Sequence, residues 1–145
     1  MPYKAVQLHL HLGKDGGLGS EHTIDGERYP MELHIVNIKE EYNSLADALK
    51  DPAGVGVLGF FYEFHRGNLR KFYPVFFPLS LLCPPLGSNT TLSGVSLDMF
   101  IPSQCNMTSY FRYHGSLTTP PCTEAVVWTI FENTIPLSRQ QVYNA

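Results

Sequence analysis

The stretch Gln7-Leu8-His9-Leu10-His11-Leu12 alternates polar and apolar residues along its whole length. Side chains on a β-strand point alternately to opposite faces of a sheet. A strand over residues 3–12 therefore places Gln7, His9 and His11 on one face and the leucines on the other. Two imidazoles that point the same way, one pleat apart, indicate a metal site, although a histidine in a strand is also common as an ordinary hydrogen-bonded residue.

A second stretch, Met31-Glu32-Leu33-His34-Ile35-Val36, has the same alternation. Antiparallel pairing of a strand over 29–38 with the first strand would bring His34 beside His9 and His11. Catalytic zinc sites use three protein ligands and leave a fourth position for water. The two strands therefore predict a zinc site with three histidine ligands.

Two polar residues accompany the predicted ligands. Gln7 lies two residues before His9, and Glu32 lies two residues before His34, each on the strand face of its histidine. A metal-bound imidazole donates its second ring N–H to such a group, which fixes the tautomer. We therefore expect Gln7 and Glu32 to orient the metal ligands.

Four motifs of this sequence resemble the α-class carbonic anhydrases in residue type, order and spacing. The resemblance covers about Tyr3 to Gln141 and is similar in style to the extracellular branch, which is secreted or membrane-anchored. It spans somewhat more than half of a family domain, so we expect the N-terminal part and the C-terminal strands to be missing. The motifs are Gln7-Leu8-His9-Leu10-His11, Gly19-Ser20-Glu21-His22-Thr23-Ile24-Asp25-Gly26, Met31-Glu32-Leu33-His34-Ile35-Val36 and Gly115-Ser116-Leu117-Thr118-Thr119-Pro120-Pro121-Cys122.

The resemblance implies a single partial domain over residues 1–145 with a mainly β (α+β) fold. A central, largely antiparallel and twisted sheet would carry short peripheral helices and be incomplete at both ends. The segment 64–86 is atypical, because its prolines break the helix that the family usually places there. Further strands are expected at 54–62, 110–113 and 126–131, a turn at Asp25-Gly26, a short helix at 43–50 with Ser44 as its N-cap, and a helix start at 138–141.

The resemblance also implies that His9, His11 and His34 hold one Zn²⁺ ion. Zinc on three neutral imidazoles makes hydroxide available at neutral pH, and this zinc-bound hydroxide would reversibly convert carbon dioxide to bicarbonate and a proton. The expected partner is therefore a small-molecule substrate, CO₂ or bicarbonate. The family's proton-shuttle histidine would lie in the absent N-terminal part.

Two further residues have catalytic roles in the resembled family. The Thr118 hydroxyl would accept the proton of the hydroxide, which aims its lone pair at the substrate, and would donate to the Glu21 carboxylate. Glu21 would then be ionised and buried, which is costly unless it is hydrogen-bonded. His22 is expected to make a structural hydrogen bond within the fold, to Tyr113 or to Glu32.

An apolar pocket for CO₂ is implied as well, with Thr119 on its substrate side. CO₂ has no net dipole, so an apolar wall avoids competition from water. Each aliphatic residue, taken alone, is more typical of an ordinary core position, and only the resemblance assigns it to the substrate. The wall would consist of Val36, Val57, Leu117, Val126 and Trp128.

Composition and cysteine usage favour a secreted origin. A net charge of −3 without a basic cluster gives no case for nucleic-acid binding. Cys122 follows a double proline, as in the extracellular branch, where its counterpart pairs with a cysteine near the start of the domain. Asn89-Thr90-Thr91 and Asn106-Met107-Thr108 are glycosylation sequons. The remaining cysteines, Cys83 and Cys105, fit buried thiols better than a bond with each other.

These features indicate an extracellular or cell-surface parent protein. We expect no signal peptide and no membrane anchor within the 145 residues, although the resemblance allows anchoring in a longer parent.

Three interpretations of the function stay open. The chain could be an active zinc enzyme, a non-catalytic carbonic-anhydrase-like binding module, or a truncated product that does not fold alone. Binding modules of this kind typically lack one or more of the zinc histidines, whereas His9, His11 and His34 are all present. The intact ligand set favours descent from an active enzyme.

Overall fold

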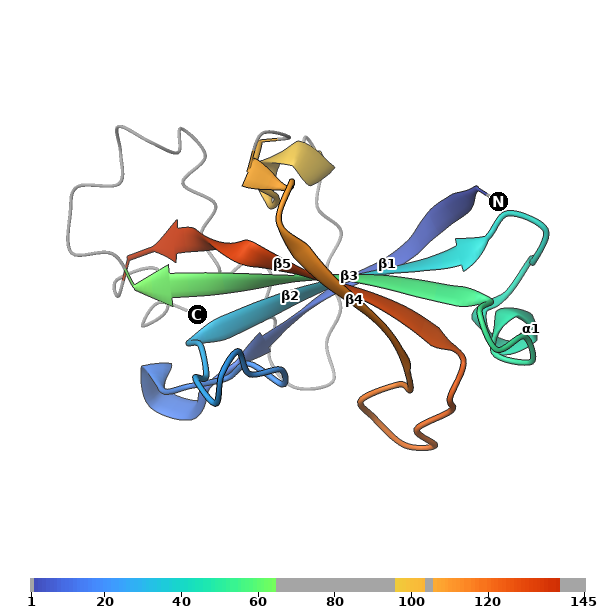
Figure 1. Cartoon of the computed structure of the whole chain (residues 1–145), viewed down its shortest axis with the longest axis horizontal. Helices are drawn as coiled ribbons and strands as arrows, with labels where there is room; N and C mark the ends of the chain where they lie inside the picture. Colours follow the sequence, from blue (N-terminus) through green and yellow to red (C-terminus); the bar gives the residue numbers. More distant parts are fainter. Residues whose placement is uncertain (1, 65–95, 104–105, 139–145) are drawn as a thin grey trace.

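The computed structural model describes residues 2–64, 96–103 and 106–138. They form a five-stranded twisted sheet with the strand order β1-β2-β3-β5-β4 (Figure 1). Neighbouring strands pair antiparallel, except that β3 and β5 are parallel. This arrangement confirms the predicted mainly β fold with a largely antiparallel sheet. The strands are β1 (Tyr3–Leu12), β2 (Met31–Lys39), β3 (Val55–Phe64), β4 (Tyr110–Gly115) and β5 (Val126–Leu137).

The register of β1 and β2 places His9 directly opposite His34, and Gln7 opposite Val36. Side chains that lie opposite each other in an antiparallel pair project from the same face. An irregularity between Ala5 and Gln7 shifts the register before the histidines begin. The predicted pairing that joins the two histidine-bearing strands is therefore confirmed.

The sheet separates two clusters of buried side chains. We call the side of the sheet that bears Leu33 and Phe60 the apolar face, and the side that bears His34 and Trp128 the histidine face. The cluster on the apolar face consists of Met31, Leu33, Ile35, Phe60, Tyr62, Phe131, Ile135 and Leu137. The cluster on the histidine face consists of Val36, Ile38, Ala48, Val55, Val57, Phe61, Val126, Trp128 and Ile130.

Local sequence signals explain the short elements. Helix α1 (Leu45–Ala48) begins after Ser44, whose side chain accepts the Asp47 backbone N–H as an N-cap, as predicted. The turn at Asp25-Gly26 has φ angles of 51° and 84°, which glycine and aspartate tolerate better than most residues. Two 3₁₀ segments, η1 (Lys14–Gly16) and η4 (Leu97–Met99), complete the set. None of the helices in the described ranges has the length and hydropathy required to cross a membrane.

Several predictions fall on residues outside the described ranges. They concern the atypical segment beyond Phe64, the sequon at Asn89, the cysteines Cys83 and Cys105, and the helix start beyond Ser138.

Candidate metal centre

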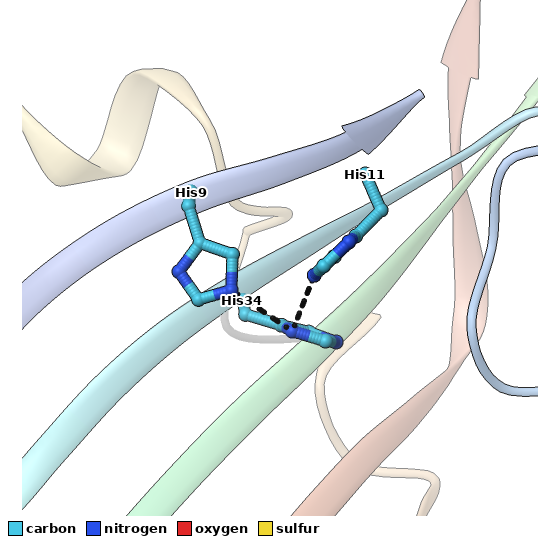
Figure 2. Close-up of side chains that lie close together, drawn as sticks. All are labelled: His9, His11 and His34. Atoms are coloured by element: carbon cyan, nitrogen blue, oxygen red, sulfur yellow. Dashed lines mark hydrogen bonds between the residues drawn. The ribbon is translucent and has the colours of Figure 1, made fainter. Parts of the chain in front are cut away.

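Three imidazoles converge on the histidine face. Figure 2 shows His9 and His11 pointing from β1 toward His34 on β2. The Nδ1 atom of His34 lies 3.0 Å from Nε2 of His11 and 3.3 Å from Nε2 of His9. Nitrogens bound to one tetrahedral zinc ion at its usual bond length are about 3.3 Å apart. The two distances to His34 therefore match those at a single zinc ion, and the ligand atoms of all three histidines lie within 4.8 Å of one another.

Glu32 fixes the orientation of His34. Its Oε1 atom lies 2.6 Å from Nε2 of His34. A carboxylate can only accept a hydrogen bond, so His34 carries its proton on Nε2 and its lone pair on Nδ1. That lone pair points toward His9 and His11, and Glu32 thus makes the hydrogen bond to His34 that an orienting residue requires.

The Glu32 carboxylate has a full set of donors although its residue is completely buried. Oε2 accepts hydrogen bonds from the backbone N–H groups of Glu21 at 2.8 Å and of His22 at 2.9 Å. Oε1 accepts hydrogen bonds from two rings, Nδ1–H of His22 at 2.6 Å and Nε2–H of His34. Burial alone raises the Glu32 pKa, but the hydrogen bonds from His22 and His34 outweigh it and hold the pKa well below its usual range. Glu32 is therefore an anion at neutral pH.

The other two candidate ligands, His9 and His11, favour the neutral form. Burial, followed by the nearby His34 and His11, lowers the pKa of His9 to about 4. Burial and His34 also lower the pKa of His11. Neutral imidazoles are the form that binds zinc, so protons do not compete strongly for these lone pairs at neutral pH.

Gln7 does not meet the partner that the sequence predicts for it. The Gln7 side chain is exposed, while Nδ1 of His9 is buried without a hydrogen-bond partner in the described part of the chain. His22 does make its predicted bonds, to Glu32 at 2.6 Å and to the Tyr113 hydroxyl at 2.6 Å. His22 thus links β4 to the polar cluster under His34.

The predicted catalytic pair lies at the edge of the metal centre. Glu21, Thr118 and His11 line one open pocket of about 760 Å³. Oε2 of Glu21 is 3.3 Å from Nε2 of His11 and has no hydrogen-bond partner among the described residues. Thr118 and Thr119 are exposed, and no hydrogen bond joins Thr118 to Glu21 in the described ranges. The catalytic roles of Thr118 and Glu21 stay predictions.

The residues predicted to line the CO₂ pocket lie beside His34. Trp128 packs edge-on against His34, with ring centroids 4.8 Å apart. The valines of the wall are buried in the same cluster, and Leu117 packs against it. The predicted wall residues Val36, Val57, Leu117, Val126 and Trp128 thus form one apolar group next to the ligands.

The sequence analysis did not predict the loop whose backbone N–H groups donate hydrogen bonds to Glu32. The buried Ser20 hydroxyl donates to the His22 carbonyl at 2.8 Å and accepts the Tyr29 N–H at 2.9 Å. These bonds hold the loop so that the N–H groups of Glu21 and His22 point at Glu32. Alternation of polar and apolar residues carries no information about such backbone donors.

Comparisons with known proteins agree with this geometry. The family model of the eukaryotic-type carbonic anhydrases matches residues 1–145. The chain is 43% identical over 140 residues to carbonic anhydrase 4 of Oryctolagus cuniculus and 37% identical over 140 residues to carbonic anhydrase 15 of Mus musculus. It is 39% identical over 143 residues to carbonic anhydrase 6 of Homo sapiens.

The coverage of these alignments is unequal. Each includes 97% of this chain, but 45% of carbonic anhydrase 4, 43% of carbonic anhydrase 15 and 46% of carbonic anhydrase 6. The chain therefore spans less than half the length of these relatives. Because the family model matches the chain over its whole length, this protein belongs to the eukaryotic-type carbonic anhydrase family.

Proposed function

We propose that this chain derives from a zinc-dependent carbonic anhydrase that interconverts carbon dioxide and bicarbonate. The supporting observation is the convergence of three ring nitrogens, one of which is held in the binding tautomer by Glu32. His9, His11 and His34 would hold the ion. Family membership supports the same reaction class.

The zinc ion would act as a Lewis acid that supplies hydroxide at neutral pH. The residues around it would bind and orient the reactants. Thr118 and Glu21 share a pocket with His11, so both are within the same small region as the ligands. We assign Thr118 to orient the nucleophile by accepting its proton and donating its own to Glu21. The unpartnered Oε2 atom of Glu21 is an acceptor that such a donor would satisfy.

The apolar group next to His34 would receive the substrate carbon dioxide. Val36, Val57, Val126 and Trp128 are each at most 5% exposed, so this side of the centre excludes water. A non-polar substrate does not need hydrogen bonds from its wall. Thr119, which is exposed near Thr118, would contact the polar product bicarbonate.

The extracellular location of the parent protein stays a prediction. Asn106 and Cys122 are exposed, as an acceptor of a glycan and a cysteine that pairs with another segment would have to be. Mass spectrometry of the natural protein from a eukaryotic cell would test both modifications.

Zinc content and CO₂ hydration of the purified chain test the proposed function. We expect one zinc per chain and stopped-flow hydration above the buffer rate. His34→Ala should abolish both, because it removes the most buried ligand. His114→Ala is the matched control, since His114 is exposed on β4 and is not one of the converging histidines.

Each outcome of this experiment has a distinct meaning. Zinc binding without turnover would show that this chain is not itself a carbonic anhydrase and would favour the binding module. Unchanged zinc stoichiometry in His34→Ala would overturn the ligand assignment.

A further inference from the structure

A chain of hydrogen bonds runs from the strand β4 to the metal ligand His34. The Tyr113 hydroxyl lies 2.6 Å from Nε2 of His22. Nδ1 of His22 lies 2.6 Å from Oε1 of Glu32, and the same oxygen lies 2.6 Å from Nε2 of His34. Tyr113 is 41% exposed, whereas Glu32 and His34 are 0% and 1% exposed, so the chain leads from the surface into the core.

The direction of each bond follows from the ionised carboxylate. Glu32 can only accept, so Nδ1 of His22 must carry a proton. In a neutral His22 the other ring nitrogen, Nε2, is then an acceptor, and the Tyr113 hydroxyl is the donor to it. A hydroxyl can donate or accept, so Glu32 selects this tautomer, and the Tyr113 hydroxyl holds the His22 ring where its Nδ1–H reaches Glu32.

If His22 adopted the opposite tautomer, its unprotonated Nδ1 would face Oε1 of Glu32. Two acceptors at 2.6 Å repel each other, so either His22 or Glu32 would move. A movement of Glu32 would also change its bond to His34. The position of the His22 ring is therefore coupled to that of His34 through one oxygen atom.

Packing holds the Tyr113 ring in place. It stacks on Trp128 with an angle of 10° between the rings, and Trp128 packs edge-on against both His22 and His34 at centroid distances of 4.7 and 4.8 Å. A Cβ atom on Gly115 would lie 2.6 Å from the Tyr113 ring, so only glycine leaves room for it there. The hydroxyl is thus directed at His22 by several independent contacts.

We propose that Tyr113 is a positioning residue of the metal centre, whose hydroxyl holds the His22 ring against Glu32 and thereby supports the orientation of His34. This role rests on the zinc site of the proposed function. It does not require that the chain catalyse CO₂ hydration, because its effect is on metal binding.

Tyr113→Phe tests this role, since it removes the hydroxyl and keeps the stacked ring. The loss of one net hydrogen bond should raise the dissociation constant for zinc about 3- to 10-fold. Competition with a chromophoric chelator measures this constant. The visible spectrum of the Co²⁺-substituted chain should also change, because it reports the geometry of the ligands.

The hydrogen bond between Tyr113 and His22 can be measured without any metal. Ring ¹⁵N shifts of the metal-free chain should show His22 protonated on Nδ1 in both proteins, with the Nε2 resonance shifted in Tyr113→Phe because that nitrogen has lost its hydrogen-bond donor. Tyr110→Phe is the matched control and should leave all three measurements unchanged. Tyr110 lies three residues earlier on β4 and is 48% exposed, and its hydroxyl has no hydrogen bond within the described residues.

The proposal would be overturned if Tyr113→Phe kept the zinc affinity and the cobalt spectrum of the wild type. A lower unfolding temperature together with unchanged metal binding is what a purely structural role of Tyr113 predicts. If the wild type binds zinc without turnover, the proposed function fails while the Tyr113 test is still decisive. A wild-type chain that binds no zinc overturns both.

Discussion

The two faces of strand β2 are equally buried but carry different side chains. On β2, Leu33 and Ile35 of the apolar face are 0% and 2% exposed, and Glu32 and His34 of the histidine face are 0% and 1% exposed. The apolar face gains stability from the removal of hydrocarbon from water, which requires only close packing. The histidine face buries ionisable groups, which is unfavourable unless every donor and acceptor is matched.

This difference separates stability from metal binding within one strand. On β2 the apolar face has no polar side chain to satisfy, so Leu33 and Ile35 can be exchanged for other apolar residues as long as volume is kept. The histidine face depends on proton positions, because Glu32 accepts four N–H groups and leaves His34 with one defined lone pair. Substitutions on the two faces should therefore affect different measurements.

Phe60→Ala should have the largest effect on stability. The Phe60 ring is fully buried and stacks on Phe131, so its removal leaves a cavity. We expect a loss of about 3–5 kcal/mol in the free energy of unfolding. Urea denaturation measures this loss, and Phe111→Ala, at a residue that is 50% exposed, should stay within about 0.5 kcal/mol of the wild type.

The zinc affinity of those Phe60→Ala molecules that remain folded should equal that of the wild type. A large loss of affinity would show that the two faces are not independent and would break the comparison.

Glu32→Gln should lower zinc affinity more than it lowers the free energy of unfolding, the opposite of Phe60→Ala. An amide group cannot accept at both ends, so its NH₂ would face either the two ring nitrogens or the two backbone N–H groups. Facing the rings, it would favour a proton on Nδ1 of His34, where the metal must bind. We expect zinc affinity to fall about 10- to 100-fold.

Chelator competition measures the affinity of Glu32→Gln, and Glu41→Gln makes the same chemical change at an exposed site as a control. If Glu32→Gln binds zinc as tightly as the wild type, the orienting role assigned to Glu32 is wrong.

Asp51 gives the smallest expected effect, because its ion pair lies outside both clusters. The hydrogen bond from Lys39, together with the Ala53 backbone N–H, lowers the pKa of Asp51 to about 2. A carboxyl whose pKa is lower in the folded state stabilises the fold above its ordinary pKa of about 4. This contribution should be lost as the pH falls from about 4 to about 2.

Thermal unfolding of the wild type and of Asp51→Asn between pH 5 and pH 2 checks this expectation. The two unfolding temperatures should differ slightly at pH 5 and converge at pH 2. A constant difference across this range would contradict the assigned pKa.

The sequence predicted the parts of the centre that depend on one strand at a time. Alternation along 7–12 and 31–36 was sufficient to place His9, His11 and His34 on common faces, since the side-chain period of a strand is fixed by the backbone. The cap at Ser44 and the turn at Asp25-Gly26 were predictable for the same reason, because each is decided by neighbours in the chain.

Two hydrogen bonds that were expected from the sequence are not present among the described residues. Gln7 is exposed and away from Nδ1 of His9, and Thr118 makes no hydrogen bond with Glu21 within the described residues. A face assignment says which way a side chain points, but it does not give the rotamer that brings two polar atoms into contact.

By itself, then, the sequence determined which residues share a face, where turns and caps fall, and which family the motifs resemble. Only the tertiary structure decided the register that sets His9 against His34, the loop donors that complete Glu32, and the contact between His22 and Tyr113, which are 91 residues apart in the chain. The physical reason is the sequence separation of the interacting residues. Local patterns follow from the backbone geometry of adjacent residues. Contacts between distant residues depend on how the whole sheet packs.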